Sequence, residues 1–286
     1  MSHPGPLPPR SSWEWLVEAA LAEDLGAGDA TTMAVVPERS NGLAELVARD
    51  ELVVAGLEVA EDVFARCGAT LIAQTQDGKR LAAGGCLARI QGPSPAILSG
   101  ERTALNFLQR LCGVATHTAR FCARIEGSRA RIVDTRKTTP GWRALEKYAV
   151  RCGGGTNHRM GLFDGILIKD NHIAAVGSVA RAVTLARERA PFGLKIQVEV
   201  ESLEQVYEAL EAGAHALLID NQPPERVKEI VQIVDGRAEL EASGGIHLDN
   251  VGDYAATGVD RISIGALTHS APAADISLEW VKSFSD

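Results

Sequence analysis

Residues 131 to 172 read RIVDTRKTTPGWRALEKYAVRCGGGTNHRMGLFDGILIKDNH, and two short apolar runs in this stretch decide the fold. The runs RIVD and GILI are rich in β-branched residues, which is typical of strands buried in a parallel sheet. Each run leads directly into polar residues, Thr135-Arg136-Lys137 after the first and Lys169-Asp170-Asn171-His172 after the second. Because functional side chains collect at the carboxyl ends of parallel strands, we expect a ligand site here.

This stretch also concentrates positive charge in an acidic chain. It holds eight Lys or Arg residues against four Asp or Glu residues, whereas the whole chain has a net charge of −8. Such a local excess of cations predicts an anionic ligand. The pI near 5.5 argues against nucleic acid as a partner, because domains that bind nucleic acid are usually basic over a broad face.

Beyond Ile132, strand patterns alternate with helix patterns. Apolar runs end at Val133, Ile168, Val200, Ile219, Leu240 and Ile264, and helix-like segments separate them at 143–151, 173–190, 202–213, 224–234 and 248–257. Such βα units form a parallel sheet with right-handed crossovers. We predict an α/β barrel because polar residues follow successive strands, and an incomplete barrel because only six strands are visible.

The first third of the chain has a different pattern. Residues 13–25 and 57–67 have helical spacing, and short alternating runs fill much of 42–90. This pattern predicts a mostly antiparallel sheet with helices on one side, an α+β arrangement. A long amphipathic helix is expected over 101–126. Gly113 within it has low helix propensity, and we expect the domain boundary there. Residues 1–12 are Pro-rich, and we expect them to be a disordered tail.

The sequence also predicts the cellular compartment. No apolar run reaches the roughly 18 residues of a membrane helix, and MSHPGPLPPR lacks the apolar core of a signal peptide, so we expect a cytoplasmic protein with no membrane partner.

The five cysteines form no Cys-x-x-Cys pair and no metal-ligand cluster; they are Cys67, Cys86, Cys112, Cys122 and Cys152. We interpret them as reduced thiols, mostly in the core. Cys152 follows Arg151, but no histidine is placed in the sequence to mark it as a nucleophile.

The predicted strand ends offer cations, carboxylates and glycines. In chain order they are Arg136, Lys137, Lys169, Glu199, Asp220, Ser243, Gly244, Gly245 and Gly265. Carboxylates suit ribose hydroxyls and Mg²⁺, while Lys and Arg suit phosphates and carboxylates. Glycines bring backbone N–H groups close to a phosphate, as in the phosphate site of α/β barrels. These residue types predict a phosphorylated and hydroxylated ligand that is bound together with a metal ion.

Seven motifs resemble those of the quinolinate phosphoribosyltransferase family. They are EDLGAGDATT and GERTALNFLQRLCG in the first domain, then DTRKTTPG, EKYAVRCGGGTNHR, IKDNH, EASGGI and IGALTHSAP. Gln222 departs from the pattern, since an aromatic or bulky apolar residue is expected after Asp-Asn. The resemblance implies an N-terminal open-faced α/β sandwich at 13–113, to which 270–286 returns, and an incomplete, about six-stranded α/β barrel at 114–269.

The resemblance also implies a reaction, in which quinolinate and phosphoribosyl pyrophosphate give nicotinate mononucleotide, pyrophosphate and CO₂ with Mg²⁺ as cofactor. By motif match, the quinolinate carboxylates are bound by Arg136, His158, Arg159 and Lys169. Lys137 binds the phosphoribosyl donor, and Glu199 and Asp220 lie at its ribose and metal. The phosphate-site motifs contain Ser243, Gly244, Gly245, Gly265 and His269. The residues expected to act in catalysis are Lys137, Lys169, Glu199 and Asp220.

The resemblance implies a head-to-tail homodimer as well, in which Arg102 reaches the active site of the partner subunit. Assemblies above the dimer are left open. Three alternatives also stand: an aldolase that forms a Schiff base on Lys169, a non-catalytic binder of phosphorylated metabolites, and the related molybdenum-transport pyrophosphorylase-like branch. Lys169 lies among cations and acids rather than in an apolar pocket, which argues against the imine. Arg136, His158 and Arg159 together favour quinolinate over the other two.

Overall fold

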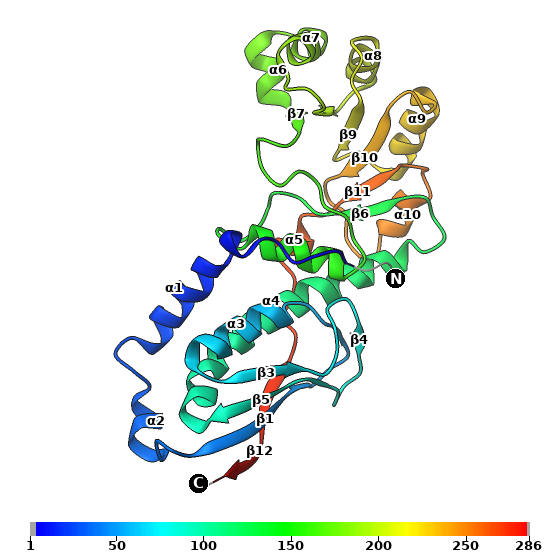
Figure 1. The fold of residues 1–286 in the computed structure, drawn as a ribbon. Helices are drawn as coiled ribbons and strands as arrows, with labels where there is room; N and C mark the ends of the chain where they lie inside the picture. Colours follow the sequence, from blue (N-terminus) through cyan, green and yellow to red (C-terminus); the bar gives the residue numbers. More distant parts are fainter. Residues whose placement is uncertain (1–3, 285–286) are drawn as a thin grey trace. The chain divides into compact units, whose positions relative to one another are not determined.

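The computed structural model describes residues 4–284, which divide into two compact units. Within the described residues, unit 1 holds 4–119, 138–154 and 267–284, and unit 2 holds 120–137 and 155–266. Figure 1 shows the course of the chain through both units. Each unit has its own main sheet.

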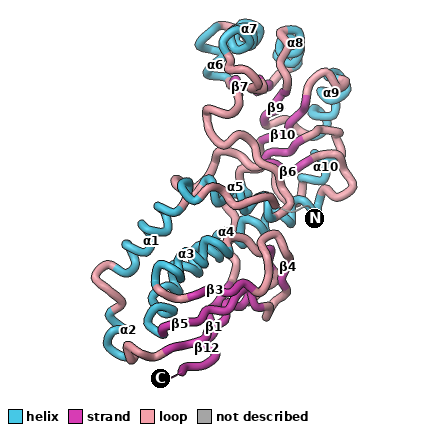
Figure 2. Tube along the Cα trace, in the orientation of Figure 1, coloured by secondary structure: helices cyan, strands magenta, loops and turns pink. Residues whose placement is uncertain are grey.

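Unit 1 is built on a four-stranded antiparallel sheet. Its strands follow the order β12 (Ile276–Phe284), β1 (Asn41–Ala48), β5 (Cys86–Pro93) and β3 (Thr70–Ala73), and β2 (Leu52–Val53) pairs separately with β4 (Arg80–Leu81). Every second residue of β1 is buried, Ala44, Leu46 and Ala48 among them, while the residues between are partly exposed. Figure 2 shows α3 (Leu57–Cys67) and α4 (Ser94–Arg124) on one side of this sheet. The predicted open-faced sandwich is confirmed.

The C-terminal segment belongs to unit 1, as the resemblance implied. Strand β12 pairs antiparallel with β1, from Ile276 opposite Ala48 to Phe284 opposite Asn41. Helix α4 continues through Gly113 instead of breaking there. A Cβ atom at Gly113 would lie 2.1 Å from the carbonyl oxygen of Pro272, so glycine is needed for the close approach of the returning segment.

The Pro-rich segment before α1 (Glu14–Leu25) is ordered where the structure describes it. Residues Arg10–Ser12 form a 3₁₀ turn, and Trp13 Nε1 donates to the Pro8 carbonyl at 3.0 Å. Arg151 donates to two further carbonyls, those of Pro4 at 2.9 Å and Pro6 at 2.7 Å. Residues 4–12 are therefore ordered and not disordered as expected, because Trp13 and Arg151 donate hydrogen bonds to the carbonyl groups of this segment. Residues 1–3 lie outside the described residues.

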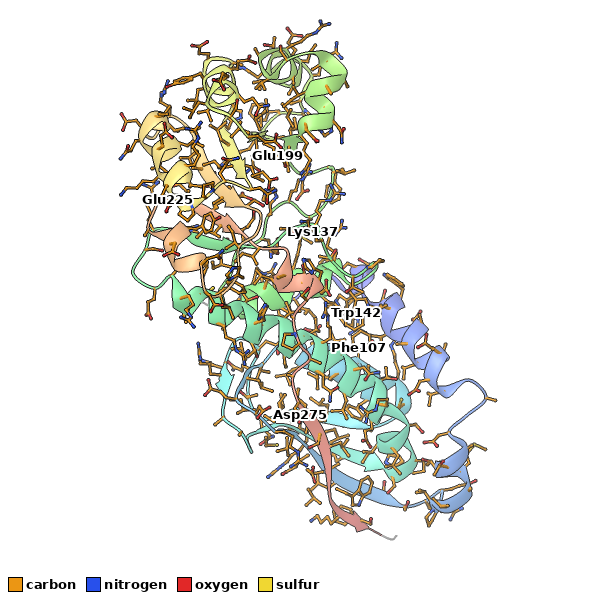
Figure 3. All side chains as sticks on the ribbon, turned by 180° about the vertical axis from the view of Figure 1, so that it is seen from behind. Phe107, Lys137, Trp142, Glu199, Glu225 and Asp275 are labelled. Carbon is orange, nitrogen blue, oxygen red and sulfur yellow. The ribbon has the colours of Figure 1, made fainter. Side chains whose placement is uncertain are left out.

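Helix α5 (Arg143–Cys152) groups with unit 1, although the sequence-based limits include it in the barrel domain. The Trp142 ring before this helix stacks on Phe107 of α4 at a centroid distance of 4.7 Å (Figure 3). Arg110 of α4 also donates to the buried Glu146 carboxylate at 2.7 Å. Cys152 ends the helix, and burial raises the pKa of its thiol to about 12, so it is no thiolate near neutral pH. All five cysteines are free thiols.

Unit 2 contains a six-stranded parallel sheet. Its strands follow the order β6 (Arg131–Val133), β11 (Arg261–Ser263), β10 (Glu239–Ser243), β9 (Ala216–Asp220), β8 (Ile196–Val200) and β7 (Ile166–Ile168). All neighbours in this order pair in parallel. Strands β6 and β7 are the two edges, and no ladder joins them among residues 4–284. The predicted incomplete six-stranded barrel is confirmed.

The helices of unit 2 follow the strands as predicted, with one difference. They are α6 (Asp170–Val176), α7 (Val179–Arg189), α8 (Leu203–Glu211), α9 (Pro224–Val234) and α10 (Val251–Ala255), and Figure 1 shows α7, α8 and α9 along one side of the sheet. The helix expected over 173–190 is two helices, because Gly177 has φ 101° and the Ser178 hydroxyl caps α7. Short helices α2 (Ala30–Val35) and α11 (Ala266–His269) complete the fold. No helix in the described part of the chain could cross a membrane.

Candidate active site

Four adjacent strands of unit 2 bring four of the predicted residues to one edge of the sheet. Lys169 directly follows β7, Glu199 lies near the end of β8, Asp220 ends β9 and Ser243 ends β10. Ser243 and Asp220 are direct register partners. Because the strands are parallel, these positions share the carboxyl edge, where barrel enzymes place their active sites.

Lys169 and Glu199 form the central ion pair of this edge. Lys169 Nζ lies 2.5 Å from Glu199 Oε2, and the Glu199 side chain is only 11% exposed. Lys169 is also the N-cap of α6, and its backbone N–H donates to His172 Nδ1 at 3.0 Å. The motif IKDNH therefore fixes the backbone at the point where the lysine leaves the sheet.

Asp220 is the second carboxylate of the edge. Burial raises its pKa, and the negative charge of Glu199 raises it further, while Lys169, Lys137 and a hydrogen bond from Asn221 act in the opposite direction. Four predicted residues, two acids and two lysines, therefore interact electrostatically in unit 2. Figure 3 labels two of them, Lys137 and Glu199.

The pKa of Asp220 should respond with opposite signs to two neighbouring substitutions. Glu199→Gln removes a like charge and frees Lys169, so the pKa of Asp220 should fall. Lys137→Ala removes an opposite charge, so the same pKa should rise. The measurement is a pH titration of carboxyl ¹³C shifts in the labelled protein, with Asp220→Asn for assignment and Asp235→Asn as a control outside the cluster. Shifts of the same sign in both variants would contradict this geometry.

A second cluster surrounds Arg159. The buried Asp134 carboxylate accepts from the His158 backbone N–H at 2.9 Å and from Asn157 Nδ2 at 2.5 Å. Burial lowers the pKa of Arg159, the nearby Arg136 cation lowers it further, and Asp164 opposes both. Two guanidinium groups that repel each other in a partly buried site favour an anion between them.

The glycines of the Ser243-Gly244-Gly245 turn have distinct roles in its geometry. Gly244 has φ 88°, and a Cβ atom there would lie 2.1 Å from Asn221 Oδ1, so no larger residue fits. Gly245 has φ 62°, and a Cβ there would meet no atom within 4 Å. The chain therefore packs tightly on one side of the turn and leaves open space on the other. This arrangement suits close approach of a phosphate to the backbone.

Glu199 and Asp220 are the candidate ligands for Mg²⁺. Burial is the main cause of the raised pKa of Asp220 and repulsion by Glu199 adds to it, and a cation between the two carboxylates would relieve this repulsion. Among the described residues, no group of three or more His, Cys, Asp or Glu side chains could hold a metal alone. Two carboxylates fit a Mg²⁺ ion that takes its remaining ligands from phosphate oxygens and water.

Two predicted residues belong to unit 1. Arg102 is exposed on α4, and His269 ends α11 with its Nδ1 2.6 Å from Ser270 Oγ. Their roles stay predictions. Gly265 is in unit 2, two residues after β11. Gln222, the departure from the family pattern, donates to the backbone carbonyl of Asp220 at 3.3 Å.

Sequence reasoning missed three polar residues of unit 2: Asp134, Gln197 and Glu241. They are buried, with exposed fractions of 0%, 8% and 1%. Gln197 and Glu241 lie inside β8 and β10, where apolar residues are expected on both faces. A charged residue within a buried strand was the signal that could have identified Glu241, because such a group needs a partner.

Two models of one protein family match most of the chain. A family model described as "Quinolinate phosphoribosyl transferase, C-terminal domain" matches residues 114–279, and the model of the N-terminal domain matches 29–112. A probable carboxylating nicotinate-nucleotide pyrophosphorylase of Bacillus subtilis (strain 168) is 45% identical over 259 residues, which cover 90% of this chain and 89% of that protein. The corresponding protein of Mycobacterium leprae (strain TN) is 45% identical over 271 residues, 92% of this chain and 95% of its own.

Solved structures agree with this match. The nicotinate-nucleotide pyrophosphorylase from Francisella tularensis superposes with a TM-score of 0.93 at 36% identity, covering 98% of this chain and 100% of that chain. NadC from Streptococcus pyogenes gives a TM-score of 0.91 at 40% identity, with 96% and 99% covered. The likeness therefore extends over both units.

Proposed function

Because the chain belongs to the quinolinate phosphoribosyltransferase family, we propose that the carboxyl edge of its parallel sheet carries out that family's reaction. The enzyme transfers the phosphoribosyl group of phosphoribosyl pyrophosphate to quinolinate and removes one carboxylate. The products are nicotinate mononucleotide, pyrophosphate and CO₂, so the protein is a decarboxylating pentosyltransferase of NAD biosynthesis. The observation that carries the proposal is the cation set of unit 2, in which Arg136 interacts with Arg159 and Lys169 pairs with Glu199.

Quinolinate binds through its two neighbouring carboxylates. Arg136, Arg159 and Lys169 supply the positive charge, and His158 is the fourth member of this subsite. A guanidinium can bind a carboxylate with two parallel hydrogen bonds, so two arginines also fix the plane of the pyridine ring. A fixed ring keeps its nitrogen aimed at the anomeric carbon of the donor, which contributes to catalysis through orientation.

The phosphoribosyl donor occupies the other half of the edge. Lys137 binds its pyrophosphate, and the backbone at Ser243, Gly244, Gly245 and Gly265 receives its phosphates. Glu199 and Asp220 lie at the ribose hydroxyls and would hold Mg²⁺. When bound, Mg²⁺ supplies positive charge that neutralises the pyrophosphate oxygens.

The transfer needs no nucleophile from the protein. The pyridine nitrogen forms a bond to the anomeric carbon while the bond from that carbon to the pyrophosphate oxygen breaks. Positive charge that develops on the ribose is stabilised by Glu199 and Asp220, and negative charge on the leaving group is stabilised by Lys137. The ring nitrogen is then cationic, so the carbon beside it can lose CO₂, keep the electron pair and take a proton from water.

The proposal also includes a homodimer and a cytoplasmic location of the protein. We infer that Arg102 of one protomer completes the active site of its partner, as the family resemblance implies. A cytoplasmic location is supported by five free cysteines, since disulfides persist mainly in oxidising compartments.

The Schiff-base alternative makes a different prediction for Lys169. An imine-forming lysine needs a free amine that can attack a carbonyl, but Lys169 Nζ is held in an ion pair with Glu199 at 2.5 Å. Borohydride reduction in the presence of quinolinate or of a phosphorylated keto sugar should therefore leave no adduct, as measured by intact mass. A mass increase that maps to Lys169 would instead support the aldolase.

Nicotinate is the substrate that tests the dicarboxylate subsite. It lacks the second carboxylate of quinolinate, so it loses one anion that the arginines and Lys169 would bind. We expect kcat/KM for nicotinate to be lower by at least about a hundredfold in an assay for pyrophosphate release. Comparable values for the two acceptors would contradict the proposed substrate and favour a less selective binder.

A further inference from the structure

The imidazole of His158 takes part in a chain of hydrogen bonds that crosses the interior of unit 2. Its Nδ1 accepts from the backbone N–H of Arg159 at 2.8 Å, so Nδ1 carries no proton. The ring proton is therefore on Nε2, which donates to Gln197 Oε1 at 2.9 Å. The other end of the same amide, Gln197 Nε2, donates to Glu241 Oε2 at 3.1 Å.

The far end of this series of hydrogen bonds is the Glu241 carboxyl group, which is buried and has few donors. The Glu241 side chain is 2% exposed, and its Oε1 is buried without a hydrogen-bond partner among the described residues. Glu239, the other acid at this end of the sheet, already pairs with Lys195 at 3.0 Å and Arg261 at 2.7 Å. Gln197 Nε2, at 3.1 Å, is the closer donor to Glu241 Oε2, from which His158 Nε2 lies 3.5 Å away, and a buried carboxylate holds such a donor firmly.

The direction of every bond follows from Glu241. A carboxylate can only accept, so it must be the amide nitrogen of Gln197 that faces it. The amide oxygen then faces His158 and requires a proton on Nε2. As a result, Nδ1 is left as the acceptor that holds the Arg159 backbone. The peptide before His158 is also fixed, because the His158 backbone N–H donates to the Asp134 carboxylate.

We propose that Gln197 and Glu241 are positioning residues that hold the proton of His158 on Nε2 and thereby fix the backbone of Arg159. The inference rests on the proposed function, because it assigns these residues to the subsite for the quinolinate carboxylates. Neither residue needs to touch the substrate. They hold Arg159 and the imidazole of His158 in one orientation before quinolinate binds. This lowers the entropy that these side chains lose on binding.

The tautomer is measured directly by long-range ¹H–¹⁵N NMR of the full chain labelled at histidine, with His158→Asn for assignment. We expect His158 to be protonated on Nε2 and unprotonated on Nδ1 at neutral pH. In Gln197→Met, which has similar length but no acceptor, both tautomers should be populated. A proton on Nδ1 in the unmodified protein would overturn the proposal, whatever the enzyme's substrate.

Kinetics test the positioning role. Gln197→Met and Glu241→Met should each raise KM for quinolinate about tenfold and leave KM for phosphoribosyl pyrophosphate within about twofold. Glu241→Gln is the partial variant: its amide can accept from Gln197 or donate to it, so the Nε2 tautomer of His158 is no longer the only one but stays populated, and KM for quinolinate should rise by at most about threefold. The control is Thr257→Val, which removes another buried hydrogen bond of unit 2, to the Tyr254 carbonyl, and should change neither KM.

The outcomes separate this inference from the proposed function. If Gln197→Met alters the tautomer and KM for quinolinate does not change, the positioning role is wrong. If KM for quinolinate rises as much in Glu241→Gln as in Glu241→Met, the charge of Glu241 matters rather than the direction of its hydrogen bond. The proposed positioning role is then also wrong. If Gln197→Met fails to fold, the comparison of the two Glu241 variants still decides. If the unmodified protein does not turn over quinolinate, the proposed function is wrong. The NMR measurement of the His158 tautomer would then still test the hydrogen bonds from His158 through Gln197 to Glu241.

Discussion

Lys169→Arg should lower kcat/KM for quinolinate by about a hundredfold or more, although it keeps the positive charge. Lys169 leaves the sheet at the end of β7, and its compact ammonium lies 2.5 Å from the Glu199 carboxylate, which is 11% exposed. The Lys169 side chain is 45% exposed, so an arginine fits there, but its longer, planar guanidinium would hold the positive charge at a different position against Glu199. The loss should appear in steady-state assays of pyrophosphate release.

The chain provides a matched control in Lys195. This residue also pairs with a glutamate from another strand of the same sheet, Glu239, at 3.0 Å, but it precedes its strand and lies at the opposite edge. Its side chain is 69% exposed, so an arginine can be accommodated there. Lys195→Arg should keep kcat/KM within about twofold. Equal losses in the two variants would mean that Lys169 supports the sheet rather than the reaction.

Arg102→Ala and Lys137→Ala should each be nearly inactive alone and recover activity when mixed. If Arg102 completes the partner's site, a heterodimer has one site that combines an intact barrel with an intact Arg102. Half of the randomly exchanged dimers are heterodimers, so the mixture should approach roughly a quarter of the unmodified activity. The measurement is activity after subunit exchange, with exchange verified by native mass spectrometry of differently tagged chains.

A mixture of Lys137→Ala with Arg136→Ala is the control for this experiment. Both substitutions are in the barrel, so every site of that heterodimer keeps one defect and no activity should return. Recovery in the control would indicate that activity is regained by some route other than sharing a site. No recovery in the Arg102 mixture, despite verified exchange, would reject the shared site.

The positions of Lys169, Glu199, Asp220 and Ser243 were predictable because a parallel sheet aligns the carboxyl ends of its strands. Hydrophobic periodicity predicts the strands, and the residues at or next to the carboxyl end of each strand then lie at the edge of the sheet. The returning C-terminal segment and the open-faced sandwich were expected from the family resemblance, and in the structure β12 pairs with β1.

The rest depended on contacts between residues that are distant in sequence. The ring stacking of Trp142 on Phe107 groups α5 with unit 1, and the bonds from Arg151 order the proline-rich segment. Neither contact leaves a periodic signal. Gln197 and Glu241 were missed for a related reason: each has meaning only as a partner of the other and of His158, and no local pattern encodes a hydrogen-bond partner 39 or 44 residues away.

The central claim, phosphoribosyl transfer with decarboxylation at the sheet edge, is tested most directly with quinolinate that carries ¹³C only in the carboxylate beside the ring nitrogen. After incubation with phosphoribosyl pyrophosphate and Mg²⁺, we predict one labelled CO₂ for each pyrophosphate released, together with nicotinate mononucleotide that contains no label. Mass spectrometry of the gas and of the nucleotide measures both. Pyrophosphate release without labelled CO₂, or label retained in the nucleotide, would contradict the account.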